Sequence, residues 1–215
     1  PKLRIRRMST FLKELLSGTD PVAIARGLIG VEIVTETAGV ETSLIITETE
    51  AYWAPEDRAS HAYGNKRTKR TEVFYHAPGT AYVYLCYGIH EMMNVVTGPL
   101  GTPHAILLRA GAPKRGLAHI KARRNMKSFK SQLSSGPGVL TKALGIDRRY
   151  NGLDLLDPSS PVRLEVTDPL PEASQVVATP RIGIDYAGPE WSAKPWRFYL
   201  RGSPFVSRLN AFKER

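Results

Sequence analysis

The stretch VEIVTETAGVETSLIITETEAY, residues 31–52, decides the fold class. Two runs rich in β-branched residues, 31–37 and 42–52, flank Ala38-Gly39-Val40, a sequence typical of a hairpin turn. We therefore expect two neighbouring antiparallel strands here. Similar apolar and β-branched runs predict further strands at 80–87, 104–110, 162–167 and 196–201.

Helix signals are fewer. Asp20 suits an N-cap, Pro21 suits the first helical turn, and Gly27 or Gly30 can end the helix. Basic residues 113–126 and the segment 137–144 predict two more helices, and 151–161 predicts a long surface loop. Strands outnumber helices and do not alternate with them regularly. We therefore expect an α+β fold, a single domain over residues 1–215 with a mainly antiparallel curved sheet and flanking helices.

Basic residues dominate the charge. Thirty Lys and Arg against 20 Asp and Glu give a formal net charge of +10, which favours nucleic acid as the partner over a membrane surface. No segment holds the roughly 18 consecutive apolar residues that span a bilayer, and no signal-peptide pattern is evident. We expect a soluble intracellular protein, cytoplasmic or at the nucleoid if bacterial. The only cysteine, Cys86, excludes an internal disulfide and a thiolate metal cage.

Two carboxylates and an aromatic ring alternate in Glu48-Thr49-Glu50-Ala51-Tyr52. Side chains two residues apart in a strand point the same way, so Glu48, Glu50 and Tyr52 are predicted to share a face. A solvated strand face would explain this pattern without any function. The apolar approach at 44–46 instead indicates a partly buried sheet, where a carboxylate needs a partner or a catalytic purpose.

Tyrosines are concentrated between residues 78 and 88. Tyr82 and Tyr84 are predicted on one strand face, and Tyr87 stands beside Gly88, where the strand should turn. All three rings could simply pack in the core or cover the sheet. On a basic protein, tyrosines also suit stacking on nucleic-acid bases, which is worth roughly 1–3 kcal/mol per base.

Several segments together resemble one family, in order, from about residue 18 to about residue 207. They are 20–26, 48–52, 55–57 with Ser60-His61, 78–80 with Tyr82-Val83-Tyr84, Tyr87-Gly88 with Asn94, Leu107-Leu108-Arg109-Ala110, 135–137, 180–184 and 197–204. On these segments the chain resembles the alkyladenine (3-methyladenine, methylpurine) DNA glycosylase family, in a compact bacterial-type form. The resemblance implies a monofunctional base-excision-repair enzyme that flips alkylated or deaminated purines out of the duplex and hydrolyses their N-glycosidic bond.

The resemblance also implies a catalytic pair. Glu50 would be the general base that takes a proton from the water attacking C1′, and Arg109 would hold that water and favour the ionised carboxylate. Glu50 would also stabilise the positive charge that grows on the sugar as the bond breaks. Glu48, on the same face, is the rival base, and only the resemblance ranks it second.

A base pocket and a wedge are implied in the same way. Tyr52 and Tyr84 would sandwich the purine, and His61 would meet its polar edge. Asn94 would crowd the 2-amino group of undamaged guanine and so discriminate against it. Tyr87 would enter the minor groove and fill the gap left by the extruded nucleotide. Without the resemblance, His61 and Asn94 would be interpreted as structural polar residues.

The implied partner is double-stranded DNA that carries a damaged purine, bound by a monomer. Basic residues at 66–70 and 114–130 could neutralise phosphates, although either run could be only a solvated face. We find no metal-ligand spacing, dinucleotide fingerprint or P-loop, so no metal and no cofactor is predicted. The candidate lesions are 3-methyladenine, 7-methylguanine, hypoxanthine and ethenoadenine, which the sequence does not rank.

Three alternatives stay open at this point. Gly136-Pro137-Gly138 faintly resembles the helix-hairpin-helix of another glycosylase class, which would also need a downstream catalytic Asp. A non-catalytic nucleic-acid-binding module would need only basic charge and stacking tyrosines. A carbohydrate hydrolase using Glu48 and Glu50 is the most distant of the three, because neutral sugars do not require a basic surface.

Overall fold

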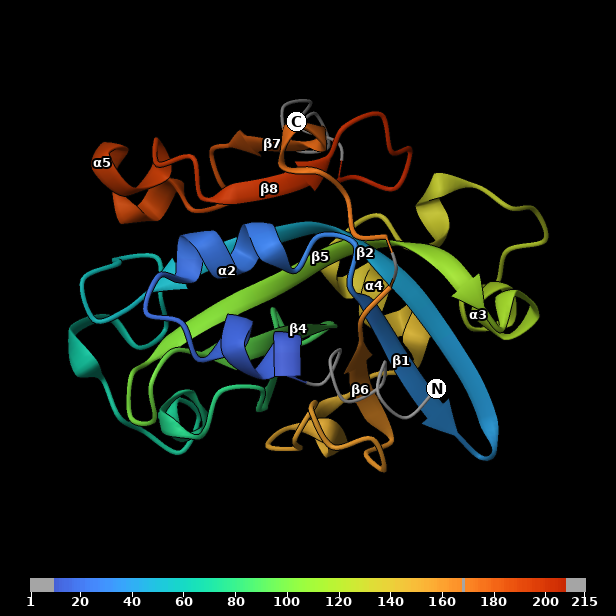
Figure 1. Cartoon of the computed structure of the whole chain (residues 1–215), viewed down its shortest axis with the longest axis horizontal. Helices are drawn as coiled ribbons and strands as arrows, with labels where there is room; N and C mark the ends of the chain where they lie inside the picture. The colour runs from blue at the N-terminus through green and yellow to red at the C-terminus, as the bar shows by residue number, and fades with distance from the viewer. Residues whose placement is uncertain (1–9, 168, 208–215) are drawn as a thin grey trace.

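The computed structural model describes residues 10–167 and 169–207, and in this part of the chain eight strands form one curled sheet (Figure 1). Every strand pairing is antiparallel, and the order is β3-β4-β5-β2-β1-β6, with β8 paired to β2 and to β7. The predicted α+β class is confirmed. The strands are β1 (Glu32–Thr37), β2 (Val40–Trp53), β3 (Ala81–Cys86), β4 (His90–Thr97), β5 (His104–Arg115), β6 (Val162–Glu165), β7 (Val176–Thr179) and β8 (Arg197–Leu200).

Short helices flank the sheet. Residues 10–16 are helical, and four further α-helices follow: α2 (Pro21–Gly27), α3 (Leu117–Arg123), α4 (Pro137–Leu144) and α5 (Pro189–Ser192). The 3-10 helices are η1 (Tyr63–Asn65), η2 (Glu72–Tyr75), η3 (Ser131–Leu133), η4 (Arg148–Tyr150), η5 (Ala173–Gln175) and η6 (Asp185–Ala187). None of the helices in the described residues is long and apolar enough to cross a membrane.

Most of the predicted elements are confirmed. Asp20 caps α2, because its Oδ1 accepts from the amides of Val22 and Ala23 at 2.8 and 3.1 Å. The β1–β2 hairpin turns at Ala38 and Gly39, both with positive φ, as a two-residue hairpin loop requires. The helix predicted at 137–144 matches α4, and 151–161 contains no helix or strand.

Other predictions were wrong in their bounds or missed an element. The helix predicted over 113–126 begins only at Leu117, because β5 stays paired with β2 as far as Arg115. Gly116 follows the strand with a φ of 65°. A side chain does not fit at this position, because an added Cβ would lie 2.5 Å from the carbonyl oxygen of Glu41. Strands β4 and β7 were not predicted, since each is short or polar at one end and is stabilised by its partners in the sheet.

The two faces of strands β3 to β5 pack in different surroundings. One face belongs to the main core, which also holds Leu16, Ile24 of α2, Ile120 of α3 and Leu140 of α4. The other face packs against a smaller cluster, of which Phe74, Tyr82 and Ala105 line the candidate site: Ala54, Ala62, Val73, Phe74, Tyr82, Val96 and Ala105. The alternation of these strands therefore separates a structural face from a functional face.

Two irregularities in the β2–β5 pairing position the candidate site. The register passes from Ile46 opposite Gly111 to Glu48 opposite Ala110, which leaves out Thr47, and then to Thr49 opposite Leu108, which leaves out residue 109. Such bulges bend a strand and change which side chains point to a given face. The unpaired residue on β5 is Arg109.

The same irregularities change the direction of the β2 side chains. Before them, the even-numbered Leu44 and Ile46 belong to the main core. After them, the odd-numbered Ala51 belongs to that core, and Thr49 Oγ1 donates to the carbonyl of Ala25 in α2. The even-numbered residues from 48 to 52 consequently face away from the main core. The prediction that Glu48, Glu50 and Tyr52 share one face of the strand is confirmed.

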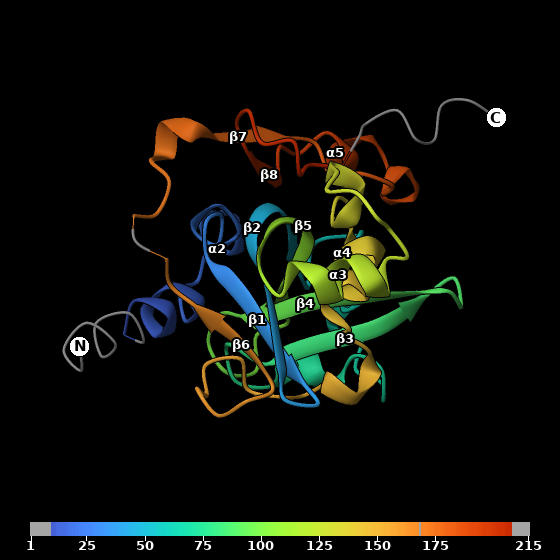
Figure 2. The same ribbon diagram turned by 90° about the vertical axis from the view of Figure 1, so that its right-hand side faces the viewer.

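The β3–β4 hairpin projects from the body of the protein (Figure 2). Tyr87 and Gly88 form its tip with φ values of 50° and 72°, and the amide of Ile89 donates to the carbonyl of Cys86 at 3.1 Å. A positive φ is unfavourable for a bulky residue such as tyrosine. Tyr87 is 91% exposed, so packing does not explain this conformation.

Candidate active site

Glu50 is a fully buried carboxylate in β2 that is surrounded by donors. Its Oε1 accepts from the backbone amide of Ile182 at 2.8 Å. Its Oε2 accepts from the hydroxyl of Tyr52 at 2.9 Å and lies 3.2 Å from Nη1 of Arg109. The carboxylate is therefore held in one orientation by groups from three segments of the chain.

Glu48 lies next to Glu50 but is occupied entirely by structural contacts. Its Oε1 accepts from Nε of Arg109 at 3.0 Å and from Nε of Arg197 at 2.6 Å, and its Oε2 accepts from the amide of Ser207 at 2.6 Å. Burial alone would raise the pKa of Glu48, but Arg109 and Arg197 hold it below the usual value. Glu48 stays ionised and anchors the two arginines.

Arg109 connects the two carboxylates. Burial would lower the pKa of its guanidinium, yet the negative charges of Glu50 and Glu48 outweigh that effect and raise it. The geometry divides the carboxylates by role, since Glu48 holds Arg109 by its Nε and Glu50 contacts the outer Nη1. Among the two candidates, only Glu50 bonds to a residue of the adjoining pocket, Tyr52.

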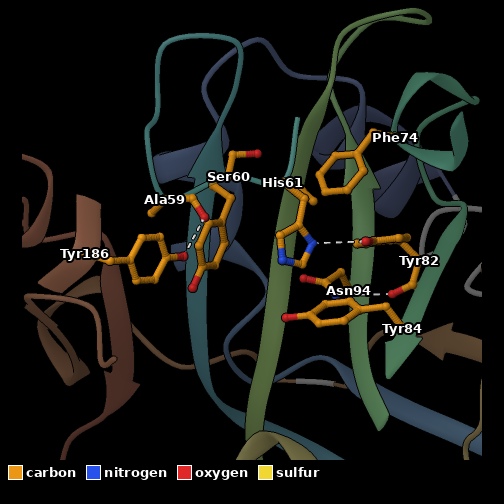
Figure 3. Close-up of a pocket in the computed structure, with 10 residues that line it drawn as sticks. Ala59, Ser60, His61, Phe74, Tyr82, Tyr84, Asn94 and Tyr186 are labelled. Atoms are coloured by element: carbon orange, nitrogen blue, oxygen red, sulfur yellow. Dashed lines mark hydrogen bonds between the residues drawn. The ribbon is translucent and has the colours of Figure 1, made fainter. Parts of the chain in front are cut away.

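An aromatic pocket adjoins Glu50 (Figure 3). The structure brings four of the predicted site residues together in its wall, from β2, the loop before η1, β3 and β4: Tyr52, His61, Tyr84 and Asn94. The remaining lining residues are Ala59, Ser60, Phe74, Tyr82, Ala105 and Tyr186. The pocket encloses only about 40 Å³ of free space, room for a few water molecules. A larger ligand can enter only if the walls move.

His61 is neutral and has a defined hydrogen-bonding arrangement. Burial, with a smaller effect from Arg70, lowers its pKa from 6.5 to about 4. Its Nε2 lies 3.4 Å from Nη2 of Arg70, which can only donate, so Nε2 is the acceptor. Its Nδ1 then carries the proton and donates to the hydroxyl of Tyr82, 3.0 Å away (Figure 3).

Stacked rings form one wall of the pocket. Tyr82 and Tyr84 stack with centroids 5.3 Å apart, and the ring of His61 meets Tyr84 edge-on at 4.6 Å. The guanidinium of Arg70 lies 4.9 Å from the centre of the Tyr84 ring. Asn94 is 4% exposed, and its Nδ2 donates to the carbonyl of Tyr82 at 3.2 Å.

Tyr52 joins the pocket to the carboxylate. Burial and the negative charge of Glu50 raise the pKa of the Tyr52 hydroxyl well above 10, so it stays protonated and donates to Glu50. Across the pocket mouth, Tyr186 is 72% exposed and donates its hydroxyl to the carbonyl of Ala59 at 3.1 Å (Figure 3). No motif in the sequence marked Tyr186 as a pocket residue.

A buried ion pair behind the site was also missed. Arg181 donates to both carboxylate oxygens of Asp57 at 2.6 and 3.0 Å, and neither side chain is exposed. A further bond of 2.9 Å joins Arg181 to the carbonyl of Ala51. The pair fixes the segment whose next residue, Ile182, donates to Glu50. The residue types at 180–184 could not reveal this contact, because a backbone amide makes it.

The basic residues near the pocket are only partly free. Arg67 makes a two-bond ion pair with Glu72, and Arg70 contacts His61 and Tyr84. Near the hairpin, Arg148 pairs with Glu91 at 3.0 Å, which compensates an acidic charge close to Tyr87. Lys66 and Lys69 are exposed. In the described residues, His, Cys, Asp and Glu form no group of three that could hold a metal ion.

Comparisons with known proteins agree on one family. The model of the family described as methylpurine-DNA glycosylase (MPG) matches residues 16–204. A protein of Bacillus cereus is 45% identical over 195 residues, 88% of this chain and 95% of that protein, and is named "Putative 3-methyladenine DNA glycosylase". Proteins with the same name from Natranaerobius thermophilus and Bacillus anthracis are 44% and 43% identical, over 87% and 88% of this chain and 94% and 95% of theirs.

Proposed function

This chain belongs to the methylpurine-DNA glycosylase family and is a DNA glycosylase, and we propose that it releases alkylated or deaminated purines with a water activated by Glu50. The single observation that supports this mechanism most is the buried carboxylate of Glu50, fixed beside an aromatic pocket by Ile182, Tyr52 and Arg109. A general base must be held within reach of the water that it deprotonates, and this arrangement leaves the Glu50 carboxylate little freedom to turn away.

The proposed reaction is a hydrolysis at C1′ of the flipped nucleotide. Glu50 takes a proton from water, the water oxygen bonds to C1′, and the electrons of the N-glycosidic bond leave with the purine. Because positive charge grows on the sugar as that bond breaks, the carboxylate stabilises the transition state as well. Arg109, which lies 3.2 Å from Glu50, also donates to this water, while Glu48 keeps Arg109 in place.

The pocket side chains select the nucleobase that is released. A purine stacks between Tyr52 and Tyr84, and electron-poor alkylated rings gain most from such aromatic contact. His61 meets the polar edge as a neutral ring, and Asn94 limits the depth of the pocket against the 2-amino group of guanine. The 3-methyladenine, 7-methylguanine, hypoxanthine and ethenoadenine lesions are the proposed substrates.

The β3–β4 hairpin provides the proposed wedge. Tyr87 stands at its tip, three residues beyond Tyr84 of the pocket, so one strand would join the intercalating ring to the stacking ring. The inserted ring offsets part of the unstacking cost, a few kcal/mol, of extruding a nucleotide. The net charge of +10 supports binding of the phosphate backbone, and the proposed binding species is a monomer.

Base release from a labelled duplex with one hypoxanthine or ethenoadenine tests the proposal. After alkaline strand cleavage, wild type gives a product band, and Glu50→Gln loses it while still shifting the duplex in a gel. Glu36→Gln, the same change at an exposed position, is the matched control and keeps full release. Equal release by wild type and Glu50→Gln would refute the role of Glu50. If wild type released neither base and 3-methyladenine DNA were also inert, a non-catalytic binding module would replace the proposal.

A further inference from the structure

All three tryptophans of the chain line one surface groove outside the aromatic pocket. Trp53 ends β2, Trp191 lies in α5, and Trp196 directly precedes β8. The rings of Trp53 and Trp196 lie 5.8 Å apart between centroids, and those of Trp191 and Trp196 lie 5.9 Å apart. Glu56 is the fourth lining residue. The groove has a volume of about 320 Å³, at the lower end of the range for small-molecule sites.

The indole rings of the groove already accept a cation. Indole rings present the most electron-rich faces among protein side chains and attract cations strongly. The ammonium of Lys194 already lies 4.8 Å from the centre of the Trp191 ring and 5.2 Å from that of Trp196. Glu56 is exposed and makes no ion pair within the residues that the structure describes. The groove therefore combines rings that accept a cation with a carboxylate that has no ion-pair partner among the described residues, and a cationic ligand would take the place of the Lys194 ammonium.

The groove and the pocket share a wall but no lining residue. Between them lies the guanidinium of Arg181, 4.8 Å from the centre of the Tyr52 ring on the pocket side and 5.1 Å from that of Trp196 on the groove side. Asp57 balances the charge of Arg181. The groove is thus a separate site, built directly behind the wall that would stack the flipped base.

We propose that the tryptophan groove is a second binding site, for the planar cationic ring of an N-alkylated purine. Flat indole surfaces match a flat ligand, Glu56 matches its positive charge, and the free volume far exceeds that of the pocket. The choice of a purine rests on the proposed function, because alkylation at a ring nitrogen is what gives a purine a positive charge. This positively charged purine ring occurs both in a released nucleobase and in a nucleobase still attached to a DNA strand.

Tryptophan fluorescence tests the groove directly, because every indole of the protein belongs to it. The full chain is titrated with 1-methyladenosine, whose ring is cationic at neutral pH, and with neutral adenosine. We expect a saturable change with 1-methyladenosine at roughly tenfold lower concentration than with adenosine, between the effects of an exposed and of a desolvated cation–π contact. Equal responses to the two nucleosides, or no response to either, would overturn the proposal.

Three variants locate the binding. Glu56→Gln removes the charge at an exposed position and should weaken 1-methyladenosine severalfold while base release is unchanged. Trp53→Leu should weaken both nucleosides; if this variant fails to fold, Glu56→Gln still decides the question. Tyr84→Ala, in the pocket, should leave the titration as in wild type. Loss of the fluorescence response in Tyr84→Ala would assign the ligand to the pocket and refute a separate site.

Two further titrations define the ligand. Tetramethylammonium carries a positive charge without a flat ring, and binding as tight as that of 1-methyladenosine would overturn the assignment to a purine. A single-stranded oligonucleotide with one 1-methyladenine distinguishes the source, since tighter binding than the nucleoside indicates a base within a strand and weaker binding a released base. Because base release is measured separately, failure of the groove and failure of the proposed catalysis give different results.

Discussion

The backbone amide of Ile182 donates a 2.8 Å hydrogen bond to the carboxylate of Glu50, although 132 positions separate the two residues in the sequence. The contact exists because β2 with the loop that follows it and the segment between β7 and β8 meet beside the pocket. A buried ion pair, Asp57 with Arg181, holds that meeting point. The orientation of the proposed general base therefore depends on two buried side chains outside the pocket wall.

Breaking this pair should reduce both stability and base release. Asp57→Asn leaves the buried guanidinium of Arg181 without its counter-charge, and we expect the free energy of unfolding to fall by about 3–5 kcal/mol. In the folded fraction, displacement of Ile182 should slow single-turnover base release by about tenfold to a hundredfold with duplex binding retained. Urea unfolding and single-turnover kinetics measure the two effects.

Asp147→Asn provides the matched control for that prediction. Asp147 pairs with Arg149, whose side chain is 80% exposed, so the loss should stay within about 1 kcal/mol. Should the two variants unfold at the same urea concentration, the Asp57–Arg181 pair would have no special structural importance.

Glu48 and Glu50 should respond differently to the same substitution. Glu48→Gln removes the negative charge that Arg109 and Arg197 share and turns one acceptor oxygen into a donor, and should cost about 3–5 kcal/mol of stability. Below its melting temperature this variant should still release base, whereas Glu50→Gln should not. A folded Glu48→Gln protein as inactive as Glu50→Gln would make Glu48 an equal candidate for the general base.

The neutral state of His61 predicts a pH dependence of stability. Its pKa is 6.5 when unfolded and about 4 when folded, so between these values the unfolded chain binds more protons. The resulting stabilisation, at most about 3 kcal/mol, is complete above pH 6.5 and is lost as the pH falls to about 4. His61→Gln should flatten this decline. His119→Gln, at an exposed position, should leave it unchanged.

Tyr87 should show opposite effects on stability and on DNA binding. Asparagine tolerates a positive φ better than tyrosine, so Tyr87→Asn should stabilise the hairpin by up to about 1 kcal/mol. Loss of the ring should weaken duplex binding by about 1–3 kcal/mol. Thermal unfolding and fluorescence anisotropy measure these changes, with Tyr87→Phe as the control that keeps a ring. Unchanged affinity in Tyr87→Asn would contradict the proposed wedge.

Local chemistry made several elements predictable from the sequence. The Asp20 cap, the Ala38-Gly39 turn and the helix at 137–144 each depend on residues adjacent in sequence. Strand β4 depends on β3 and β5 beside it, and the continuation of β5 to Arg115 depends on β2. Such pairing across the sheet is not written in any one segment, which is why those predictions failed.

The site was predictable to a similar extent. Alternation along β2 and β3 predicted that Glu48, Glu50 and Tyr52 share a face and that Tyr82 and Tyr84 do, and the structure confirms both. The roles of the individual residues came from the family resemblance and stay predictions. The contacts of Ile182 and of the Ser207 amide could not be predicted, because backbone groups make them and no residue type identifies them.

The two irregularities in the β2–β5 pairing also constrain how this protein can change over generations. One residue inserted or deleted between 46 and 50, unless a further bulge absorbs it, would turn Glu50 and Tyr52 toward the main core. A lineage can therefore alter its preferred lesion by exchanging side chains but not by altering the length of β2. Gains and losses of residues should accumulate instead at the exposed turn 157–159, because residues 152–155 just before it are bonded to Gly79, Ala81 and Leu164.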